Sequence, residues 1–310
     1  MTSTDIKSDP GTSNFSFAKH ETFHLRDGWI YKGLQALQTD SSALHHTDAH
    51  HNLGIGINML KSLIYWLRAT NLVEIRRIKG QVKPTLELTP LSRLILQVDP
   101  YFEDIVTLWL LHIELSSNRS LATFIYWAFN ECSQREFREE RLVREIRQFI
   151  DENEAKQVAQ SSLEKDARCF IHTYLSSDYG QNTNTLDNIE CPLTSLDLIR
   201  RGAIPGHYKF YVGEHRQLPL EIFIYTLFKF RDLANQGGVV SLEDIRWAPY
   251  SPGRILNIDM HRILEYIEEI EHTSSYLHLA RTAELNMVTL DNSIETVTLL
   301  RDCYQLREKQ

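Results

Sequence analysis

The pattern of hydrophobic and polar positions is most regular in residues 53–96, where it predicts a helix followed by a β-hairpin. Apolar residues recur three or four positions apart, which lines one face of an α-helix and buries it: Ile57, Leu60, Ile64 and Leu67. A neighbouring row has the same spacing and gives the helix a polar, cationic outward face: Asn58, Lys61, Tyr65 and Arg68. Gly54 and Gly56 precede this helix and supply the permissive backbone of a tight helix-to-helix turn.

The pattern changes to strand periodicity after Asn71. Residues 72–75 and 82–88 are expected to form short strands, joined by a basic turn. The basic residues of this turn are Arg76, Arg77 and Lys79, followed by Gly80. With shorter helices expected over residues 28–38 and 45–52, the order of elements predicts a winged helix-turn-helix.

The rest of the chain is mainly helical in pattern. Thr89 and Pro90 are suited to the N-cap and first position of a helix. Further helices are expected over residues 105–115, 121–130, 134–153, 220–234, 261–271 and 289–310, and strands over 196–199, 208–212 and 255–258. The predicted fold is α+β and predominantly α, with an N-terminal winged helix-turn-helix, a helical middle and a smaller mixed C-terminal domain.

We expect four segments along the chain. Residues 1–14 are rich in Ser, Thr, Asp and Gly and are predicted to be a disordered tail. Residues 15–175 form the winged-helix domain with its helical extension, residues 176–188 a polar linker, and residues 189–310 a mixed α/β domain.

Composition and charge narrow the class of protein. The chain is 310 residues long with a net charge of −8, yet residues 53–89 carry six basic and two acidic side chains, a net of +4. A local cationic patch on an acidic protein directs a polyanion to one face, which favours nucleic-acid binding. The alternative is a solvated helix and hairpin that only pack on the next domain.

Other classes are disfavoured. The richest apolar run, residues 105–115, is interrupted by His112 and Glu114, so no membrane span is expected. The polar N-terminus lacks a signal-peptide core, which predicts a cytoplasmic protein. The four cysteines are scattered without a C-x-x-C pair, which argues against a zinc site or a disulfide framework.

Five ordered strings resemble the SspB-like family over about residues 15–290. They are HETFHLRDGWIYKG (20–33), LGIGINMLKSLIYW (53–66), DPYFEDIVTLWLLH (99–112), CPLTSLDLI (191–199) and SPGRILNID (251–259). Members of this family accompany bacterial genes for DNA phosphorothioation, the replacement of a non-bridging phosphate oxygen by sulfur. The resemblance implies a DNA-nicking antiphage component whose partners are a cysteine desulfurase, an ATPase and a sulfur-activating ATP pyrophosphatase.

Metal-dependent nicking requires carboxylates that hold one or two divalent cations and orient a water molecule. Three acids lie within six residues, just after the predicted winged helix: Asp99, Glu103 and Asp104. We consider them catalytic and metal-ligating candidates for Mg²⁺ or Mn²⁺. The structural alternative is that Asp99 forms a turn and the other two favour a helix start. Glu21, within the first family string, is a further catalytic candidate.

Three other patterns carry less weight. His20, Glu21 and His24 match H-E-x-x-H, but their surroundings are not helical, which disfavours a zinc protease. His207 and Lys209 are similar to half of a phospholipase D-type signature, with Glu214 in place of its aspartate. A cluster of four histidines is expected to lie on the surface: His45, His46, His50 and His51.

The sequence therefore predicts a DNA-binding nickase whose polar and cationic side chains hold duplex DNA. These are Asn58, Lys61, Tyr65, Arg68, Arg76, Arg77, Lys79 and Lys83, with Asn58 and Lys61 best placed to reach bases in the major groove. The main alternative is a non-catalytic adaptor that recognises a DNA sequence and recruits the ATPase and sulfur-transfer proteins. A transcriptional regulator is a third possibility.

Overall fold

The computed structural model describes residues 15–77, 84–153, 155–176, 190–213, 215, 218–234, 237–281 and 286–305. Over these residues the fold is α+β and mostly helical, as predicted. The predicted tail and nearly all of the predicted linker lie outside the described residues, as do Lys79, Lys83 and Glu214.

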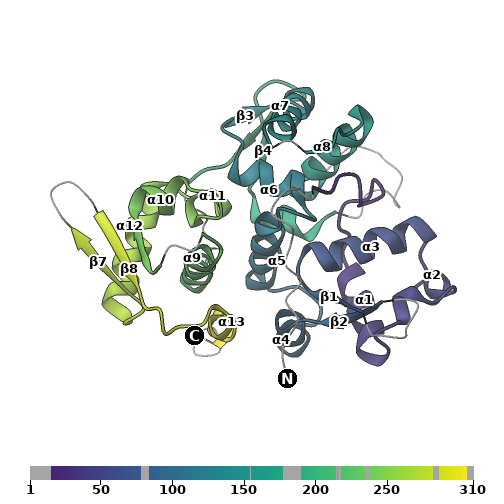
Figure 1. Cartoon of the computed structure of the whole chain (residues 1–310), viewed down its shortest axis with the longest axis horizontal. Coiled ribbons are helices and arrows are strands. Elements are labelled where there is room, and N and C mark those ends of the chain that lie inside the picture. Colours follow the sequence, from purple (N-terminus) through teal and green to yellow (C-terminus); the bar gives the residue numbers. More distant parts are fainter. Residues whose placement is uncertain are drawn as a thin grey trace.

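The N-terminal module consists of three helices and a hairpin (Figure 1). Its elements are α1 (Trp29–Thr39), the 3₁₀ turn η1 (Ala43–His45), α2 (Ala49–Asn52), α3 (Ile57–Ala69), β1 (Val73–Arg76) and β2 (Thr85–Leu88). The helix over 28–38, the helix from Ile57 and the two strands are confirmed. The helix expected over 45–52 is shorter, because the chain forms η1 before α2.

Helix α3 packs its buried side on α1. Leu63 and Leu67 are fully buried, and a Cβ on Gly33 of α1 would lie 2.8 Å from a Leu67 methyl carbon. Glycine at position 33 therefore permits the two helices to approach closely. The predicted apolar stripe is wrong at its start, because Ile57 is 58% exposed. The buried face is instead centred on Leu63, Trp66 and Leu67.

The centre of the molecule is a buried helix. The elements here are α4 (Pro90–Val98), α5 (Ile105–Ser117), α6 (Thr123–Asn130), β3 (Glu136–Phe137), α7 (Glu139–Glu152) and α8 (Gln160–Tyr174). Thr89 caps α4 by accepting a hydrogen bond from the Ser92 backbone N–H, as the sequence predicts. Every residue of α5 from Val106 to Ser116 is buried, which explains its almost unbroken apolar sequence.

The two ionisable residues of that run, His112 and Glu114, both have hydrogen-bond partners. His112 lies between the Tyr174 hydroxyl, 2.9 Å from its Nδ1, and the Ile255 carbonyl, 2.8 Å from its Nε2. Burial lowers the pKa of His112 to about 4, so its imidazole is neutral at physiological pH. Glu114 accepts hydrogen bonds from the Tyr225 hydroxyl and the Lys229 ammonium, each at 2.7 Å, and so ties α5 to a C-terminal helix.

The C-terminal part is mixed. It comprises η2 (Pro192–Leu196), β4 (Ile199–Arg201), β5 (Tyr208–Phe210), α9 (Leu220–Ala234), β6 (Val239–Ser241), α10 (Leu242–Trp247), α11 (Pro252–Ile255), α12 (Met260–Thr273), β7 (Leu277–Arg281), β8 (Asn286–Leu290) and α13 (Thr296–Gln305). The strands form antiparallel sheets in the orders β3-β5-β4 and β6-β8-β7. The strand expected over residues 255–258 is wrong, because Ser251 and Pro252 start the short helix α11.

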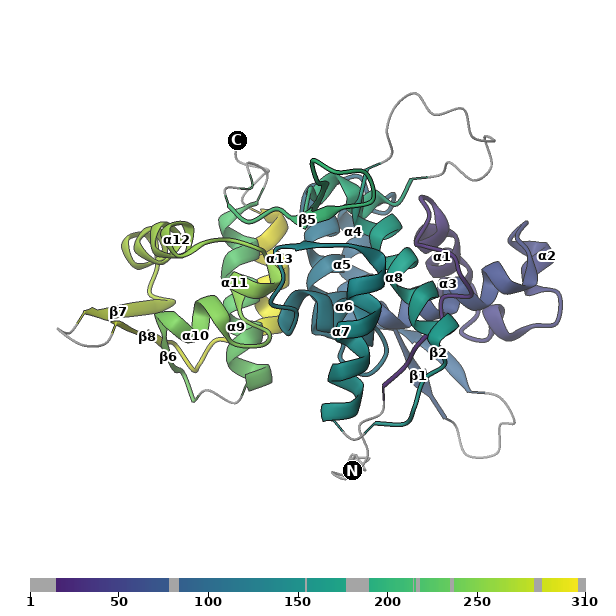
Figure 2. The same cartoon turned by 90° about the horizontal axis from the view of Figure 1, so that it is seen from above.

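Elements from both sides of the predicted linker pack together. Strand β3 precedes it, yet pairs with β5, which follows it. Figures 1 and 2 show α5 and α6 between the N-terminal module and the group formed by α9 to α13. Among the described residues, no helix is both long and apolar enough to cross a membrane.

Candidate nucleic-acid interface

The exposed side of α3 presents a small polar group near its start. Asn58 and Lys61 are both exposed, and the Lys61 ammonium donates a hydrogen bond of 3.2 Å to the Asn58 side-chain oxygen. The N-cap of the helix is Gly56, with extended backbone, after Gly54 in the left-handed region at φ +66°. An amide and an ammonium thus share one solvent-facing turn of a helix, an arrangement suited to phosphates or base edges.

The structure divides the predicted outward row of α3. Tyr65 is half-buried beside His20, with the two ring centroids 6.2 Å apart, and burial raises the pKa of its phenol. Arg68 is also half-buried, and burial lowers the pKa of its guanidinium. Asn58 and Lys61 therefore lie at the surface, whereas Tyr65 contributes mainly to packing.

The hairpin adds cationic side chains beyond the end of α3. Arg76 donates from Nη1 to both carboxylate oxygens of Glu87, at 2.9 and 3.0 Å, across the β1–β2 pair. Arg77 follows directly, is exposed, and has no ion pair within the described residues. The structure thus offers one neutralised and one unneutralised arginine at the described end of the hairpin.

The turn that carries Glu21 is strained and firmly held. Ala18, Glu21 and Thr22 have φ values of 54°, 51° and 71°, the left-handed region that non-glycine residues seldom occupy. The Asp166 carboxylate on α8 accepts from the Ala18 backbone N–H at 2.8 Å and lies 3.0 Å from His20 Nε2. Residues with such unfavourable backbone angles are concentrated at functional sites, so this turn is a candidate for function.

His20 orients the turn through both of its ring nitrogens. The Thr22 backbone N–H donates to His20 Nδ1 at 3.1 Å, so Nδ1 acts as the acceptor and Nε2 carries the proton toward Asp166. His20 is 2% exposed, and His20 and His24 are not on a helix, so the turn lacks the geometry of an H-E-x-x-H zinc site.

This anchoring places Glu21 at the polar face of α3. A Glu21 carboxylate oxygen lies 4.0 Å from the Lys61 ammonium, and both side chains are substantially exposed. The structure therefore brings together three residues that the sequence separates: Glu21, Asn58 and Lys61. Sequence reasoning missed the two residues that make this possible, His20 as an anchor and Asp166 as its partner.

The acids of the Asp99–Asp104 turn have different surroundings. Asp99 is 9% exposed and accepts from the Glu103 and Asp104 backbone N–H groups, each at 3.0 Å, and from the Thr107 hydroxyl at 2.6 Å. Asp104 caps α5 by accepting from the Val106 N–H at 2.9 Å, while Glu103 is exposed.

This turn and the first residues of α5 contact α1 and α13. Tyr101 packs on Tyr31 of α1 with centroids 5.1 Å apart, and the Thr107 hydroxyl lies 2.7 Å from the Tyr304 hydroxyl of α13. The predicted acids thus fall into two places, Glu21 on the α3 face and the other three at the α4–α5 turn.

The structure does not bring the four predicted acids into one cluster. Within the described ranges, no group of three or more His, Cys, Asp or Glu side chains is arranged to hold a metal ion. Asp99 and Asp104 already accept hydrogen bonds, whereas Glu103 is exposed, and the assignment of these three acids as metal ligands stays a prediction. Glu21 can supply a single ligand.

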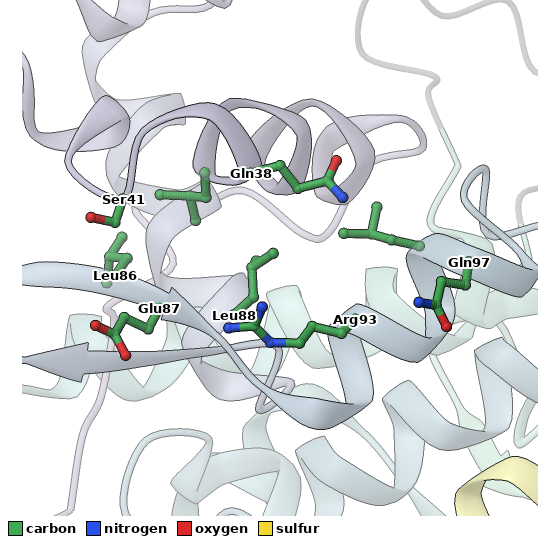
Figure 3. Close-up of a pocket in the computed structure, with 9 residues that line it drawn as sticks. Gln38, Ser41, Leu86, Glu87, Leu88, Arg93 and Gln97 are labelled. Carbon is green, nitrogen blue, oxygen red and sulfur yellow. The ribbon is translucent and has the colours of Figure 1, made fainter.

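A separate pocket of about 670 Å³ lies behind the hairpin (Figure 3). The end of α1, strand β2 and helix α4 line it, and its polar residues are Gln38, Ser41, Glu87, Arg93 and Gln97. None of the predicted site residues lines it, so we assign it no part in the interface.

Comparison with known proteins identifies the family. A family model described as "Protein of unknown function (DUF4007)" matches residues 17–304. The chain belongs to this family. It is also similar to two solved SspB structures, which makes this DUF4007 protein SspB-like. No curated protein matches the sequence.

The similarity to SspB extends over nearly the whole chain. The crystal structure of magnesium ion-bound SspB has a TM-score of 0.83 and 27% sequence identity, and the match covers 95% of this chain and 87% of that one. A second SspB crystal structure has a TM-score of 0.83 and 26% identity, with coverages of 96% and 89%. The resemblance predicted from five sequence strings is therefore confirmed by the SspB-like fold.

Proposed function

We propose that this SspB-like protein binds duplex DNA with the exposed side of α3 and the β1–β2 hairpin, and nicks one strand during DNA phosphorothioation. The observation that carries the proposal is the grouping of Glu21, Asn58 and Lys61 on one exposed face, with Glu21 and Lys61 4.0 Å apart. The similarity to SspB supports the role in a phosphorothioation system.

The topology supports a winged-helix interpretation of the N-terminal module. Three α-helices precede the hairpin, and the Leu86 backbone N–H of β2 donates at 2.9 Å to the Ser41 carbonyl, between α1 and α2. A winged helix commonly has a short strand at this position against its hairpin. In such a module the third helix enters the major groove and the hairpin contacts the backbone. Asn58 and Lys61 then face bases, and Arg76 and Arg77 face phosphates.

Glu21 is the acid we place nearest the DNA. Mg²⁺ commonly binds through one or two carboxylates together with water molecules and substrate phosphates, so one protein carboxylate on a DNA-binding face is a sufficient start for a site. One solved SspB structure contains magnesium. When bound, a divalent cation stabilises charge at phosphorus and activates water. The chain's own contribution is to position Glu21 through His20 and Asp166, beside the Lys61 ammonium.

A non-catalytic adaptor is the second candidate function. The observation in its favour is the structural engagement of Asp99 and Asp104, which leaves Glu21 and Glu103 as the available members of the predicted acidic set. The adaptor would use the same α3 face to recognise DNA and would recruit the ATPase and sulfur-transfer proteins.

Plasmid relaxation distinguishes the two functions. The purified protein is incubated with supercoiled plasmid in Mn²⁺, in Mg²⁺ and in EDTA, and open circles are quantified. Duplex binding is measured in parallel by fluorescence anisotropy. The nickase produces open circles only with a divalent cation, whereas an adaptor binds duplex in all three conditions and produces none. Absence of duplex binding in every condition would contradict both functions.

A further inference from the structure

A second cationic cluster lies far from α3, at the junction of α10 and α11. It contains Trp247, the last residue of α10, with Arg246 before it and Arg254 in α11, and the charge of Arg135, before β3, acts on Arg246. Figures 1 and 2 both place α10 and α11 on the other side of α5 and α6 from α3. The proposed duplex interface does not include this cluster.

The backbone forces two of these arginines together around the tryptophan. A Cβ on Gly253 would lie 2.4 Å from the Arg246 carbonyl oxygen and 2.7 Å from its Cα, so only glycine permits this approach of α11 to α10. The Arg246 guanidinium carbon then lies 3.8 Å from the Trp247 ring centroid, and that of Arg254 lies 5.5 Å from it. Trp247 nevertheless remains 43% exposed.

Backbone carbonyls fix the two guanidinium groups. Arg254 donates to the Trp247 carbonyl at 3.1 Å and the Cys132 carbonyl at 3.2 Å, and Arg246 donates to the Gly253 carbonyl at 3.2 Å. Carbonyl contacts orient a guanidinium without neutralising its charge. In the described part of the chain, Arg135, Arg246 and Arg254 form no ion pair with a carboxylate.

The positive charges of these arginines repel one another. Burial, the Arg254 charge and the Arg135 charge all lower the pKa of Arg246, and burial lowers the pKa of Arg254. Nearby carboxylates partly offset these effects: Glu131 raises the pKa of Arg254, and Asp259 and Glu243 raise the pKa of Arg246. A cluster of partly desolvated cations is relieved by an incoming anion, so this arrangement is suited to an anionic ligand.

We propose that Trp247 and Arg254 form a binding site for single-stranded DNA, with a base stacked on the indole and the adjoining phosphate held by the Arg254 guanidinium. Stacking on an exposed aromatic ring beside arginines is the general means by which proteins bind unpaired strands. Arg246 lies against the indole and keeps it in place. This inference shares with the proposed function only the assumption that DNA is the ligand. The residues differ from those of the duplex interface, and the ligand is a single strand.

Anisotropy with a fluorescent single-stranded oligonucleotide of about 12 bases tests the site. Trp247→Ala should weaken binding about tenfold, since stacking contributes roughly 1–3 kcal/mol per base. The matched variant Trp247→Phe retains an aromatic ring and should keep most of the affinity. Arg254→Ala should weaken binding and reduce the slope of log K against log salt by about 0.7. Arg93→Ala, an exposed arginine of the Figure 3 pocket, is the control and should bind as the wild type does.

The outcomes separate this inference from the duplex interface. Trp247→Ala should leave duplex binding unchanged, and Arg76→Glu/Arg77→Glu should weaken duplex binding equally in the wild-type and Trp247→Ala backgrounds. The inference is overturned if the wild-type protein does not bind the single strand, or if Trp247→Ala and Arg254→Ala bind it as the wild type does. It is also overturned if the hairpin variant alone abolishes single-strand binding, since that places the strand on the α3 face.

Discussion

The α3 face and the α4–α5 turn both contain acids that the sequence marks for chemistry, but their surroundings differ. On the α3 face, the Glu21 side chain is 37% exposed and lies 4.0 Å from the Lys61 ammonium. At the α4–α5 turn, Asp99 is buried and accepts three hydrogen bonds of 3.0 Å or less. A carboxylate already saturated by donors serves the fold, while one that is exposed beside a cation remains available to a ligand.

The largest effect should come from Asp99→Asn. The amide cannot accept at both side-chain positions as the carboxylate does, so two backbone N–H groups and the Thr107 hydroxyl compete for one oxygen. We expect the free energy of unfolding to fall by about 2–4 kcal/mol, measured by urea denaturation. Glu103→Gln, in the same turn but exposed, is the control and should change stability little. Normal stability combined with lost nicking would instead make Asp99 part of the active site.

The next effect concerns the hairpin. Reversing two charges with Arg76→Glu/Arg77→Glu should weaken duplex binding by about tenfold or more and lower the salt slope by roughly 0.9 for each phosphate that the hairpin no longer neutralises. Anisotropy at several salt concentrations measures both quantities. Arg93→Glu, a charge reversal behind the hairpin, is the matched control. Unchanged affinity and slope in the double variant would exclude the hairpin from the interface.

A smaller effect should follow from releasing Arg76. In Glu87→Gln the ion pair with Arg76 is removed, but because this pair is exposed its stability contribution is about 0–1 kcal/mol. The freed guanidinium and the removed negative charge should strengthen duplex binding about twofold and steepen its salt dependence. Glu74→Gln removes an equal charge from the facing strand and controls for net charge alone. Weaker binding by Glu87→Gln would mean that Glu87 itself contacts the DNA or orders the hairpin.

Local sequence signals predict much of the fold. The Thr89–Pro90 start of α4, the buried α5 and the strands around the hairpin were accessible because each depends on neighbouring residues. The apolar run at residues 255–258 suggested a strand, since short apolar runs suit either structure. Ser251 and Pro252 instead start the helix α11, because the Ser251 side chain caps it by accepting from the Arg254 N–H at 3.3 Å.

The candidate site was less predictable. Glu21 and Lys61 were both identified, but their proximity depends on His20 and Asp166, which are 146 residues apart in the chain. Likewise, the grouping of Arg254 with Arg246 and Trp247 depends on the close contact at Gly253 and on the packing of α11 near the chain after α6. Such long-range neighbours leave no periodic signal in one sequence. The sequence also does not show that Asp99 accepts three hydrogen bonds from within the fold.

The most direct test of the central claim compares nicking by Glu21→Gln and Glu103→Gln. Both substitutions remove one exposed or half-buried carboxylate charge and keep the side-chain shape, and duplex binding of each variant is measured beside its conversion of supercoiled plasmid to open circles. We predict that Glu21→Gln binds duplex DNA but loses most of its nicking, while Glu103→Gln nicks as the wild type does. Full nicking by Glu21→Gln together with its loss in Glu103→Gln would contradict the claim and place the chemistry at the α4–α5 turn.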